Sequence, residues 1–216
     1  MKAKDSFIAI PDRIAAGSYL ILGALCAEEL TIKNCRPDHM DATVKILEQY
    51  GVEMKISSDS ITVLGTSSGK NNAPITVLGG VRRQNLNIRT HEYPGFSTDL
   101  QSPLVTFLTQ MNAETIVFET IFEGRFKYVE DLTQLGADIT IMNPREILIN
   151  GPTQFHAPSP EGIIMAHDIR AGFAVIIAAI LAKGVTTIKN IHLIDRGYEQ
   201  IELVLTALGV HIQRIS

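Results

Sequence analysis

Three segments of this chain repeat one pattern, and internal repetition of this kind constrains a fold before any single residue does. The repeated motifs are PDRIAAG at 11–17, STDLQSP at 97–103 and AHDIRAG at 166–172. Each motif opens an apolar run, which is followed by a short β-like stretch and then by a charged stretch that ends at a glycine. The 216 residues therefore divide into three copies of one structural unit.

The spacing inside the unit is nearly constant. When Arg13, Asp99 and Asp168 are aligned as one column, a closing glycine follows 37 to 41 residues later in every unit. The closing glycines are Gly51, Gly136 and Gly209. The variable length lies between the units, which is how surface loops behave relative to packed elements.

Each unit predicts a helix, a strand, a second helix and a second strand. The first helix is apolar nearly all round, which is typical of a buried helix, and in the third unit it should run from about 169 to 182. The closing glycine suits the left-handed backbone conformation that ends many helices. The strands expected after these glycines are 52–56, 137–141 and 210–215.

These elements predict an α/β fold: an inside-out α/β barrel domain built from three repeated βαβαβ-type units with pseudo-threefold symmetry. The apolar first helices would lie inside and the sheets outside. The units span about 7–80, 86–151 and 162–216. We expect a single domain over 1–216, because each unit needs its neighbours to cover its apolar face.

Composition narrows the possible functions. A net charge of −4 without a basic tract argues against nucleic-acid binding. No signal peptide or transmembrane run is evident, so we expect a cytoplasmic protein that does not bind membranes. Two cysteines are too few for a disulfide framework, and the six histidines lack the spacing of metal ligands. We therefore predict no metal and no cofactor.

The segment 91–101 offers two interpretations of Asp99. A turn precedes it, and Ser97 or Thr98 could cap the helix that follows, so Asp99 could simply favour a helix start. Alternatively, its carboxylate could take a proton from a substrate hydroxyl at the mouth of the helix. The exposed N–H groups at the same place would attract anionic groups.

The motif IDRGYE at 194–199 places Arg196 at a turn that leads into a helix. An arginine there could grip a carboxylate or phosphate with its planar guanidinium group. It could equally be a surface arginine paired with Asp195 or Glu199. Arg125 is the equivalent feature one unit earlier, and both alternatives apply to it.

Six motifs carry a family resemblance over the whole length of the chain. They are IPDRIAAG (10–17), NCRPDHMD (34–41), YPGFSTDLQ (93–101), ETIFEGRF (119–126), DIRA (168–171) and IDRGYEQIE (194–202). In this order they resemble the enolpyruvyl transferases, and most of all the members that act on UDP-N-acetylglucosamine. That family has two similar domains, each an inside-out barrel of three units, with the active site between them. This chain resembles only the domain that contains the C-terminus, so the second domain is expected to be absent.

The resemblance implies transfer of an enolpyruvyl group from phosphoenolpyruvate to the 3-hydroxyl of UDP-N-acetylglucosamine, the first committed step of peptidoglycan synthesis. Asp99 would be the candidate general base near that hydroxyl. Ile121 would offer a backbone contact to the nucleotide sugar. Arg125 and Arg196 would lie on the phosphoenolpyruvate side, and Asp168 and Arg170 would form a pair near the cleft.

The chain also departs from the family pattern. The other family domain supplies a Lys-Asn pair and a mobile loop with a cysteine, whereas Cys26 and Cys35 lie in different motifs. Ser97 stands where the family has proline, and His167 stands where a small hydroxyl residue is usual.

These observations predict one half of an enolpyruvyl transferase, which should be inactive without its second domain because groups that act as a unit lose catalysis together. Two alternatives stay open. The acceptor could be another molecule such as shikimate 3-phosphate. The chain could instead be a non-catalytic module that binds a nucleotide sugar or serves as a scaffold.

Overall fold

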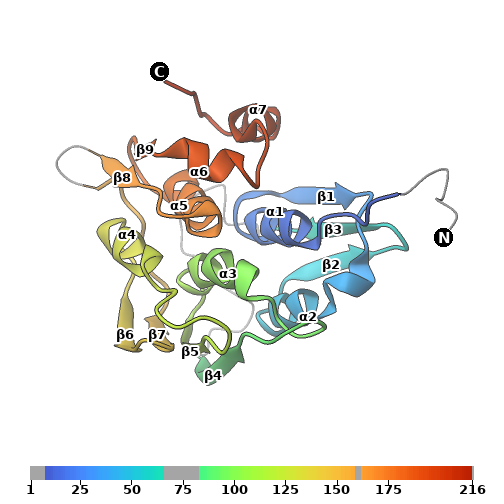
Figure 1. Cartoon of the computed structure of the whole chain (residues 1–216), viewed down its shortest axis with the longest axis horizontal. Helices are drawn as coiled ribbons and strands as arrows, with labels where there is room; N and C mark the ends of the chain where they lie inside the picture. The colour runs from blue at the N-terminus through green and yellow to red at the C-terminus, as the bar shows by residue number, and fades with distance from the viewer. Residues whose placement is uncertain (1–7, 66–82, 159–161, 216) are drawn as a thin grey trace, which may run out of the picture.

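A computed structural model describes residues 8–65, 83–158 and 162–215 of the chain. Its centre is formed by three apolar helices that contact one another, with strands and shorter helices around them (Figure 1). The central helices are α1 (Arg13–Cys26), α3 (Gln101–Leu108) and α5 (Ile169–Leu181). The third helix was expected at about 169 to 182, and the prediction is confirmed.

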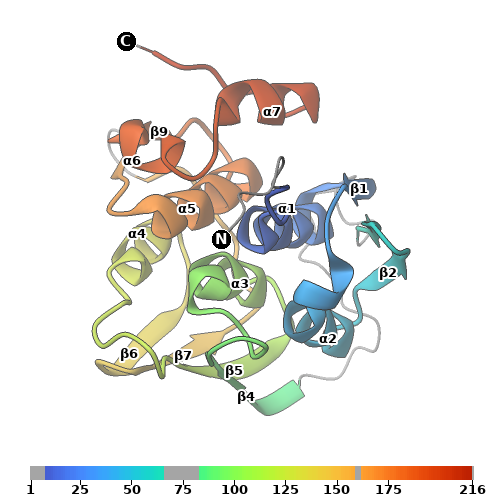
Figure 2. The same ribbon diagram turned by 45° about the vertical axis from the view of Figure 1, so that its right-hand side comes forward.

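The strands form three separate sheets within the described residues. The first sheet is antiparallel in the order β1-β3-β2, and helix α2 connects β1 to β2. Its strands are β1 (Glu29–Lys33), β2 (Glu53–Ile56) and β3 (Ser60–Leu64), and the segment between β1 and β2 forms the 3₁₀ helix η1 (Pro37–His39) and α2 (Asp41–Gln49). This sheet packs against α1 (Figure 2).

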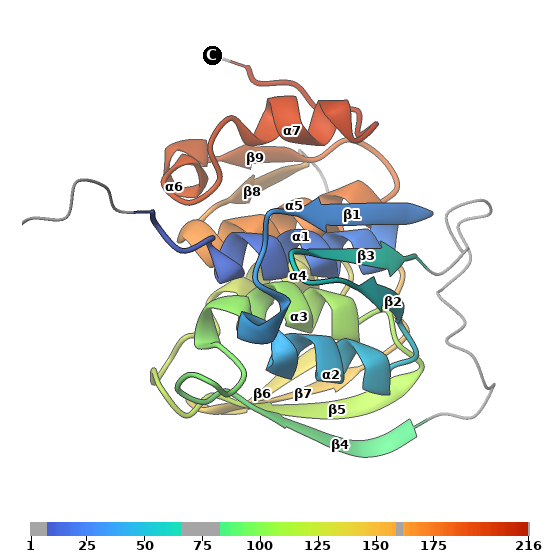
Figure 3. The ribbon, with the colours of Figure 1, turned by 90° about the vertical axis from the view of Figure 1, so that its right-hand side faces the viewer.

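The second sheet has the order β4-β5-β7-β6, with β4 parallel to β5 and the other pairs antiparallel. Its strands are β4 (Arg83–Arg89), β5 (Ala113–Phe118), β6 (Ile139–Asn143) and β7 (Glu146–Asn150). The 3₁₀ helix η3 (Thr98–Leu100) lies between β4 and β5 in the chain, and α4 (Tyr128–Gln134) lies between β5 and β6. The third sheet is the parallel pair β8-β9. Its strands are β8 (Ile163–Met165) and β9 (Thr187–Lys189), and the helices α6 (Ile191–Asp195) and α7 (Ile201–Ala207) follow β9 in the chain. Figure 3 shows the apolar helices between the second and third sheets.

The central helices start at side-chain caps. Asp12 accepts hydrogen bonds from the backbone N–H groups of Ile14 and Ala15, and Asp168 caps α5 in the same way. In the second unit Ser97 caps η3, which continues directly into α3. The residues that cap the starts of these helices are therefore Asp12, Ser97 and Asp168. The sequence alignment through Arg13 and Asp99 is wrong by one or two residues, because motif similarity does not fix the first helical residue.

The closing glycines adopt the predicted left-handed conformation. Gly51, Gly136 and Gly209 have φ angles of 86°, 108° and 91°, and they follow α2, α4 and α7. Glycine alone adopts this region without steric strain, so it ends each helix and turns the chain back. This prediction is confirmed at all three glycines.

An aromatic cluster joins two of the central helices beneath the functional site described below. Tyr19 of α1 meets Phe173 of α5 edge to face, and the ring of Tyr198 stacks on Phe173 at a centroid distance of 4.3 Å. The hydroxyl groups of Ser18 and Tyr198 are 2.7 Å apart, so the buried phenol has a polar partner. Contacts of this kind fix the segment after α6 against α1 and α5.

Two expectations differ from the structure. The sheets remain separate in the described residues, so a closed barrel is not seen there. The segment 210–215 forms no strand, whereas β2 and β6 form where predicted. Each of those strands pairs with the next strand along the chain, β3 or β7, and the described part of the third unit offers 210–215 no such partner. The predicted unit boundary near 80 lies outside the described residues.

No helix in the described ranges is long and apolar enough to span a membrane. The prediction of a single domain over 1–216 stays a prediction.

Replacing Gly136 by alanine should destabilise the protein more than the same change at Gly209. Both need a left-handed backbone, which costs a non-glycine residue about 1 to 2 kcal/mol. A Cβ at Gly136 would also lie 2.7 Å from the carbonyl oxygen of Gln154, whereas a Cβ at Gly209 meets no described atom within 4 Å. We expect an extra loss of about 1 to 3 kcal/mol for Gly136→Ala in urea unfolding. Equal losses for the two variants would refute the close approach.

Candidate functional site

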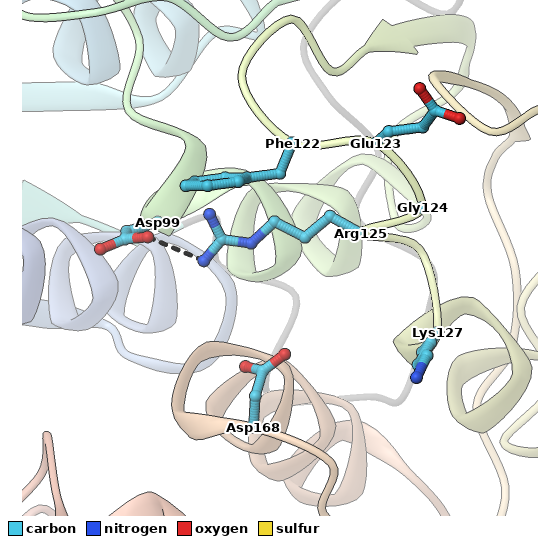
Figure 4. Close-up of a pocket in the computed structure, with 7 residues that line it drawn as sticks. All are labelled: Asp99, Phe122, Glu123, Gly124, Arg125, Lys127 and Asp168. Carbon is cyan, nitrogen blue, oxygen red and sulfur yellow. Dashed lines mark hydrogen bonds and ion pairs between the residues drawn. The ribbon is translucent and has the colours of Figure 1, made fainter.

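An open pocket lies where the loop after β5 meets the N-terminal ends of the central helices (Figure 4). Its volume is about 430 Å³. The lining residues are Asp99, Phe122, Glu123, Gly124, Arg125, Lys127 and Asp168. Five of these seven residues carry charged side chains, so the pocket is suited to a polar, ionised ligand.

The closest polar contacts in the pocket join Arg125 to the start of η3. Its Nη2 donates to Oδ1 of Asp99 at 2.7 Å, and its Nη1 donates to Oγ1 of Thr98 at 2.7 Å. The guanidinium carbon lies 5.1 Å from the centre of the Phe122 ring. The side chains of Arg125 and Asp99 are 23% and 38% exposed, so both can contact a molecule in the pocket.

A second arginine approaches the same carboxylate. Nε of Arg170 lies 3.9 Å from Oδ2 of Asp99, and its guanidinium carbon lies 5.4 Å from the centre of the Tyr198 ring. Nη1 of Arg170 is buried and has no hydrogen-bond partner in the described part of the chain. A Cβ at Gly197 would lie 3.2 Å from this atom, so glycine there lets the backbone approach the arginine. Asp99 thus lies between two guanidinium groups.

Behind the pocket, a fully buried carboxylate holds its two main segments together. Oε2 of Glu119 accepts hydrogen bonds from Thr98 Oγ1 at 2.8 Å and from Gln101 Nε2 at 3.0 Å. Oε1 accepts from the backbone N–H groups of Ile121 and Phe122 at 2.8 and 3.0 Å. The carboxylate therefore fixes the loop that carries Arg125 to the turn that carries Asp99.

The network continues to Tyr128, whose hydroxyl donates to Oε1 of Gln101 at 2.7 Å. Burial, followed by the nearby Glu119, raises the pKa of Tyr128 well above its usual value of 10. Sequence analysis missed Glu119 and Gln101. Glu119 opens the motif ETIFEGRF, so a signal was present, but a buried polar role has no periodic signature in a sequence.

The other predicted site residues are distributed unevenly. Asp168 lines the pocket, although its Oδ1 also accepts from the N–H groups of Arg170 and Ala171 at 2.7 Å each. The N–H of Ile121 is bound to Glu119. Arg196 is exposed after α6 and is not among the side chains that line the pocket.

The structure does not pair Arg196 with Asp195, which was one alternative from the sequence; Asp195 pairs with another arginine. Asp195 is bound by both terminal nitrogens of Arg214, at 2.7 and 2.9 Å. Both interpretations of Asp99 have support: Ser97 caps η3 as predicted and Asp99 lies in its first turn, while the Asp99 carboxylate faces Arg125. No cluster of three or more potential metal ligands occurs in the described ranges, and the absence of a cofactor stays a prediction.

Glu119→Gln should lower the stability of the chain, because an amide would turn N–H groups toward donors that now meet a carboxylate. We expect a loss of about 1 to 3 kcal/mol in urea unfolding, the usual cost of unsatisfied buried groups. The matched control is Glu123→Gln, whose side chain is 67% exposed and lies 3.7 Å from Arg145. The control should change stability by less than about 0.5 kcal/mol. If both variants behave alike, Glu119 does not hold the two segments together.

Curated relatives match nearly the whole chain. The chain is 37% identical to the UDP-N-acetylglucosamine 1-carboxyvinyltransferase of Koribacter versatilis, covering 96% of this chain and 43% of that protein. The enzyme of the same name from Thermodesulfovibrio yellowstonii is 34% identical, covering 100% of this chain and 47% of the relative. The chain thus spans less than half the length of the relatives it matches.

Solved structures show the same relationship in three dimensions. The enolpyruvyl transferase NikO from Streptomyces tendae superposes with a TM-score of 0.76 at 25% identity, over 94% of this chain and 44% of that one. EPSP synthase from Acinetobacter baumannii superposes with a TM-score of 0.59 at 13% identity, over 84% of this chain and 39% of that one, and so supports the fold alone. The family model of EPSP synthase (3-phosphoshikimate 1-carboxyvinyltransferase) matches residues 2–205. The chain therefore belongs to the EPSP synthase family of enolpyruvyl transferases.

Proposed function

We propose that this chain forms one wall of the active site of an enzyme that transfers an enolpyruvyl group to the 3-hydroxyl of UDP-N-acetylglucosamine. The supporting observation is the placement of Asp99 between Arg125 and Arg170 at an open pocket. A carboxylate can act as a base, and two guanidinium groups can bind an anionic donor such as phosphoenolpyruvate. The single site therefore combines both functions that the transfer requires.

The relatives favour the nucleotide sugar over the alternative acceptor. Sequence identity is 34 to 37%, over 96 to 100% of this chain, to proteins named for UDP-N-acetylglucosamine. Shikimate 3-phosphate stays an alternative that binding experiments can distinguish. If the acceptor is the nucleotide sugar, the enzyme belongs to peptidoglycan synthesis and would act in the cytoplasm.

The proposed chemistry is an addition followed by an elimination. The sugar hydroxyl adds to the central carbon of phosphoenolpyruvate, its proton passes to a base, and an acid protonates the methylene carbon. The resulting tetrahedral ketal then loses a proton from the new methyl group and releases phosphate. Asp99 would be the base, and Arg125 would hold the donor while orienting the Asp99 carboxylate through their 2.7 Å contact.

The remaining predicted residues have supporting roles in this proposal. Because the Ile121 N–H is bound to Glu119, a contact of its backbone with the nucleotide sugar would use the carbonyl oxygen. Arg170, 16% exposed, would add positive charge beside Asp99, and Asp168 would line the opposite side. Arg196 would reach the donor only if its exposed side chain turns toward the cleft when substrate binds.

The proposal also includes a second domain as the missing wall. The chain spans 43 to 47% of its relatives, and its pocket is open. A trianionic donor calls for cations on more than one side, so we expect no turnover by this chain alone.

We also propose that the three units are arranged with pseudo-threefold symmetry as an inside-out barrel. The left-handed closing glycines support this arrangement, and so do Asn34 and Asn190, which end similar strands with φ angles of 54° and 60°. The three contacting apolar helices occupy the centre that such an arrangement requires.

Phosphate release tests the function. We expect none from this chain with phosphoenolpyruvate and UDP-N-acetylglucosamine, and clear release when the chain is joined to the remaining half of the Koribacter versatilis relative. Calorimetry with UDP-N-acetylglucosamine and with shikimate 3-phosphate compares the acceptors. If the joined protein releases phosphate with shikimate 3-phosphate but not with UDP-N-acetylglucosamine, the acceptor is shikimate 3-phosphate. Sugar-nucleotide binding without release by the joined protein would favour the non-catalytic module.

Asp99→Asn in the joined protein should slow turnover by about 10²- to 10⁴-fold, the range for loss of a general base. Its stability should fall by no more than about 1 kcal/mol, because the pair with Arg125 is partly exposed. Asp38→Asn is the matched control, since Asp38 is bound by Arg36 at 2.9 Å and its side chain is 60% exposed. Full turnover in Asp99→Asn together with a lower melting temperature would show that Asp99 has only a structural role.

A further inference from the structure

Two residues outside the proposed chemistry meet beside the pocket. His167 departs from the pattern of the family, and Asp131 is a buried carboxylate with no role in binding or transfer. Nε2 of His167 lies 3.4 Å from Oδ2 of Asp131. One residue belongs to the segment before α5 and the other to the first turns of α4, so the contact joins two elements that are far apart in sequence.

The surroundings of the two partners differ. Asp131 is 4% exposed, and its Oδ2 has no hydrogen bond of good geometry among the described residues, so the contact with His167 is an ion pair whenever the imidazole is protonated. The His167 side chain is 43% exposed and can exchange protons with solvent. Among the described residues, His167 is the one basic side chain within 4 Å of the buried Asp131 carboxylate. A proton gained or lost by its imidazole therefore changes the charge that faces this carboxylate.

The pair is not primarily a device for stability. Burial raises the pKa of Asp131 from 3.8 to about 6, while His167 lowers it and Glu130 raises it further. Because folding raises this pKa, the charged form destabilises the fold above about pH 6, and the penalty disappears as the pH falls toward 3.8. A neutral residue would avoid this cost, so a role in the neighbouring pocket accounts better for the pair.

The position of the pair gives it such a role. Lys127 immediately precedes α4 and Asp168 immediately precedes the first residue of α5, and both line the pocket. Asp131 lies one turn after Lys127, and His167 directly precedes Asp168. Attraction between His167 and Asp131 therefore draws together the two helix starts that carry these pocket residues.

Few other charges face the pair. On α4 they are Glu130 and Lys127, and at the start of α5 they are Asp168 and Arg170. The strands β6 and β8 carry no charged residue. His156 lies near Gly136, at the opposite end of α4.

We propose that His167 and Asp131 are positioning residues whose ion pair sets the separation of Lys127 and Asp168 across the pocket, and releases it when His167 loses its proton or Asp131 gains one. The value of this device for catalysis rests on the proposed function, but the movement itself does not. The pocket should thus loosen as the pH falls through about 6, where Asp131 gains its proton.

The test follows His167 and Lys127 in the 216-residue chain by NMR as the pH is raised, without substrate. Lys127 is the decisive reporter, because it is distant from His167 in sequence. We expect its amide shift to include a step with the same midpoint as the His167 imidazole. In Asp131→Asn the step at Lys127 should disappear, because a neutral amide offers the imidazole no charge to attract.

Two further variants separate a positioning role from a purely structural one. His167→Gln can still donate a hydrogen bond but cannot titrate in this range, so the step at Lys127 that shares the imidazole midpoint should disappear while the fold is retained. Only a step from Asp131 itself can remain. His91→Gln is the matched control, because His91 pairs with Glu92 at 3.0 Å and both side chains are more than 70% exposed. It should leave the step unchanged. The proposal is overturned if the titration curve of Lys127 is the same in His167→Gln, or in Asp131→Asn, as in the parent chain. Because substrates are absent, either result leaves the proposed function standing.

Discussion

The pocket depends on one buried carboxylate that accepts four hydrogen bonds. Glu119 joins the loop after β5 to the start of η3, so Arg125 and Asp99 meet although they lie 26 residues apart. A buried charge costs several kcal/mol unless its lone pairs are satisfied, and here both oxygens are occupied by donors from the two segments. Loss of this group would free both segments at once. The contact between Arg125 and Asp99 is then a consequence of the buried network, since Thr98 is bound to Glu119 and to Arg125.

The central helices also position Arg170 of α5 near the Asp99 carboxylate. Phe173 and Tyr198 stack beneath Arg170, and Gly197 leaves room for the guanidinium group. A rigid aromatic base holds a long cationic side chain at little entropic cost, because its rotamers are already restricted. A residue of the loop after β5 and a residue of α5 thus converge at one carboxylate. The packing of α3 against α5 therefore matters for the site.

Periodic features of the sequence were good predictors, and environment-dependent features were not. The buried helices and the left-handed glycines at Gly51, Gly136 and Gly209 follow from local rules that each unit satisfies independently. The motifs around Asp99 and Arg125 identified two residues that meet in space. Glu119 and the pairing of Asp131 with His167 were missed, because the partner of a buried polar group depends on tertiary packing. The strand expected at 210–215 failed for a related reason: alternation gives a segment strand character, but a strand also needs a neighbour.

The energetically costly features are concentrated around one end of the central helices. Of the three buried side-chain atoms without a hydrogen-bond partner in the described residues, two belong to Arg170 and Asp131, on either side of the start of α5. Phe122 is 53% exposed on the adjoining loop. Buried polar groups of folded proteins normally have hydrogen-bond partners, so these two atoms cost stability. Neither residue lines the pocket itself, but Arg170 approaches Asp99 and Asp131 contacts His167, the neighbour of Asp168. Phe122, Arg125 and Asp99 remain accessible beside these buried groups, so the costs of burial lie next to the side chains that a bound molecule can contact.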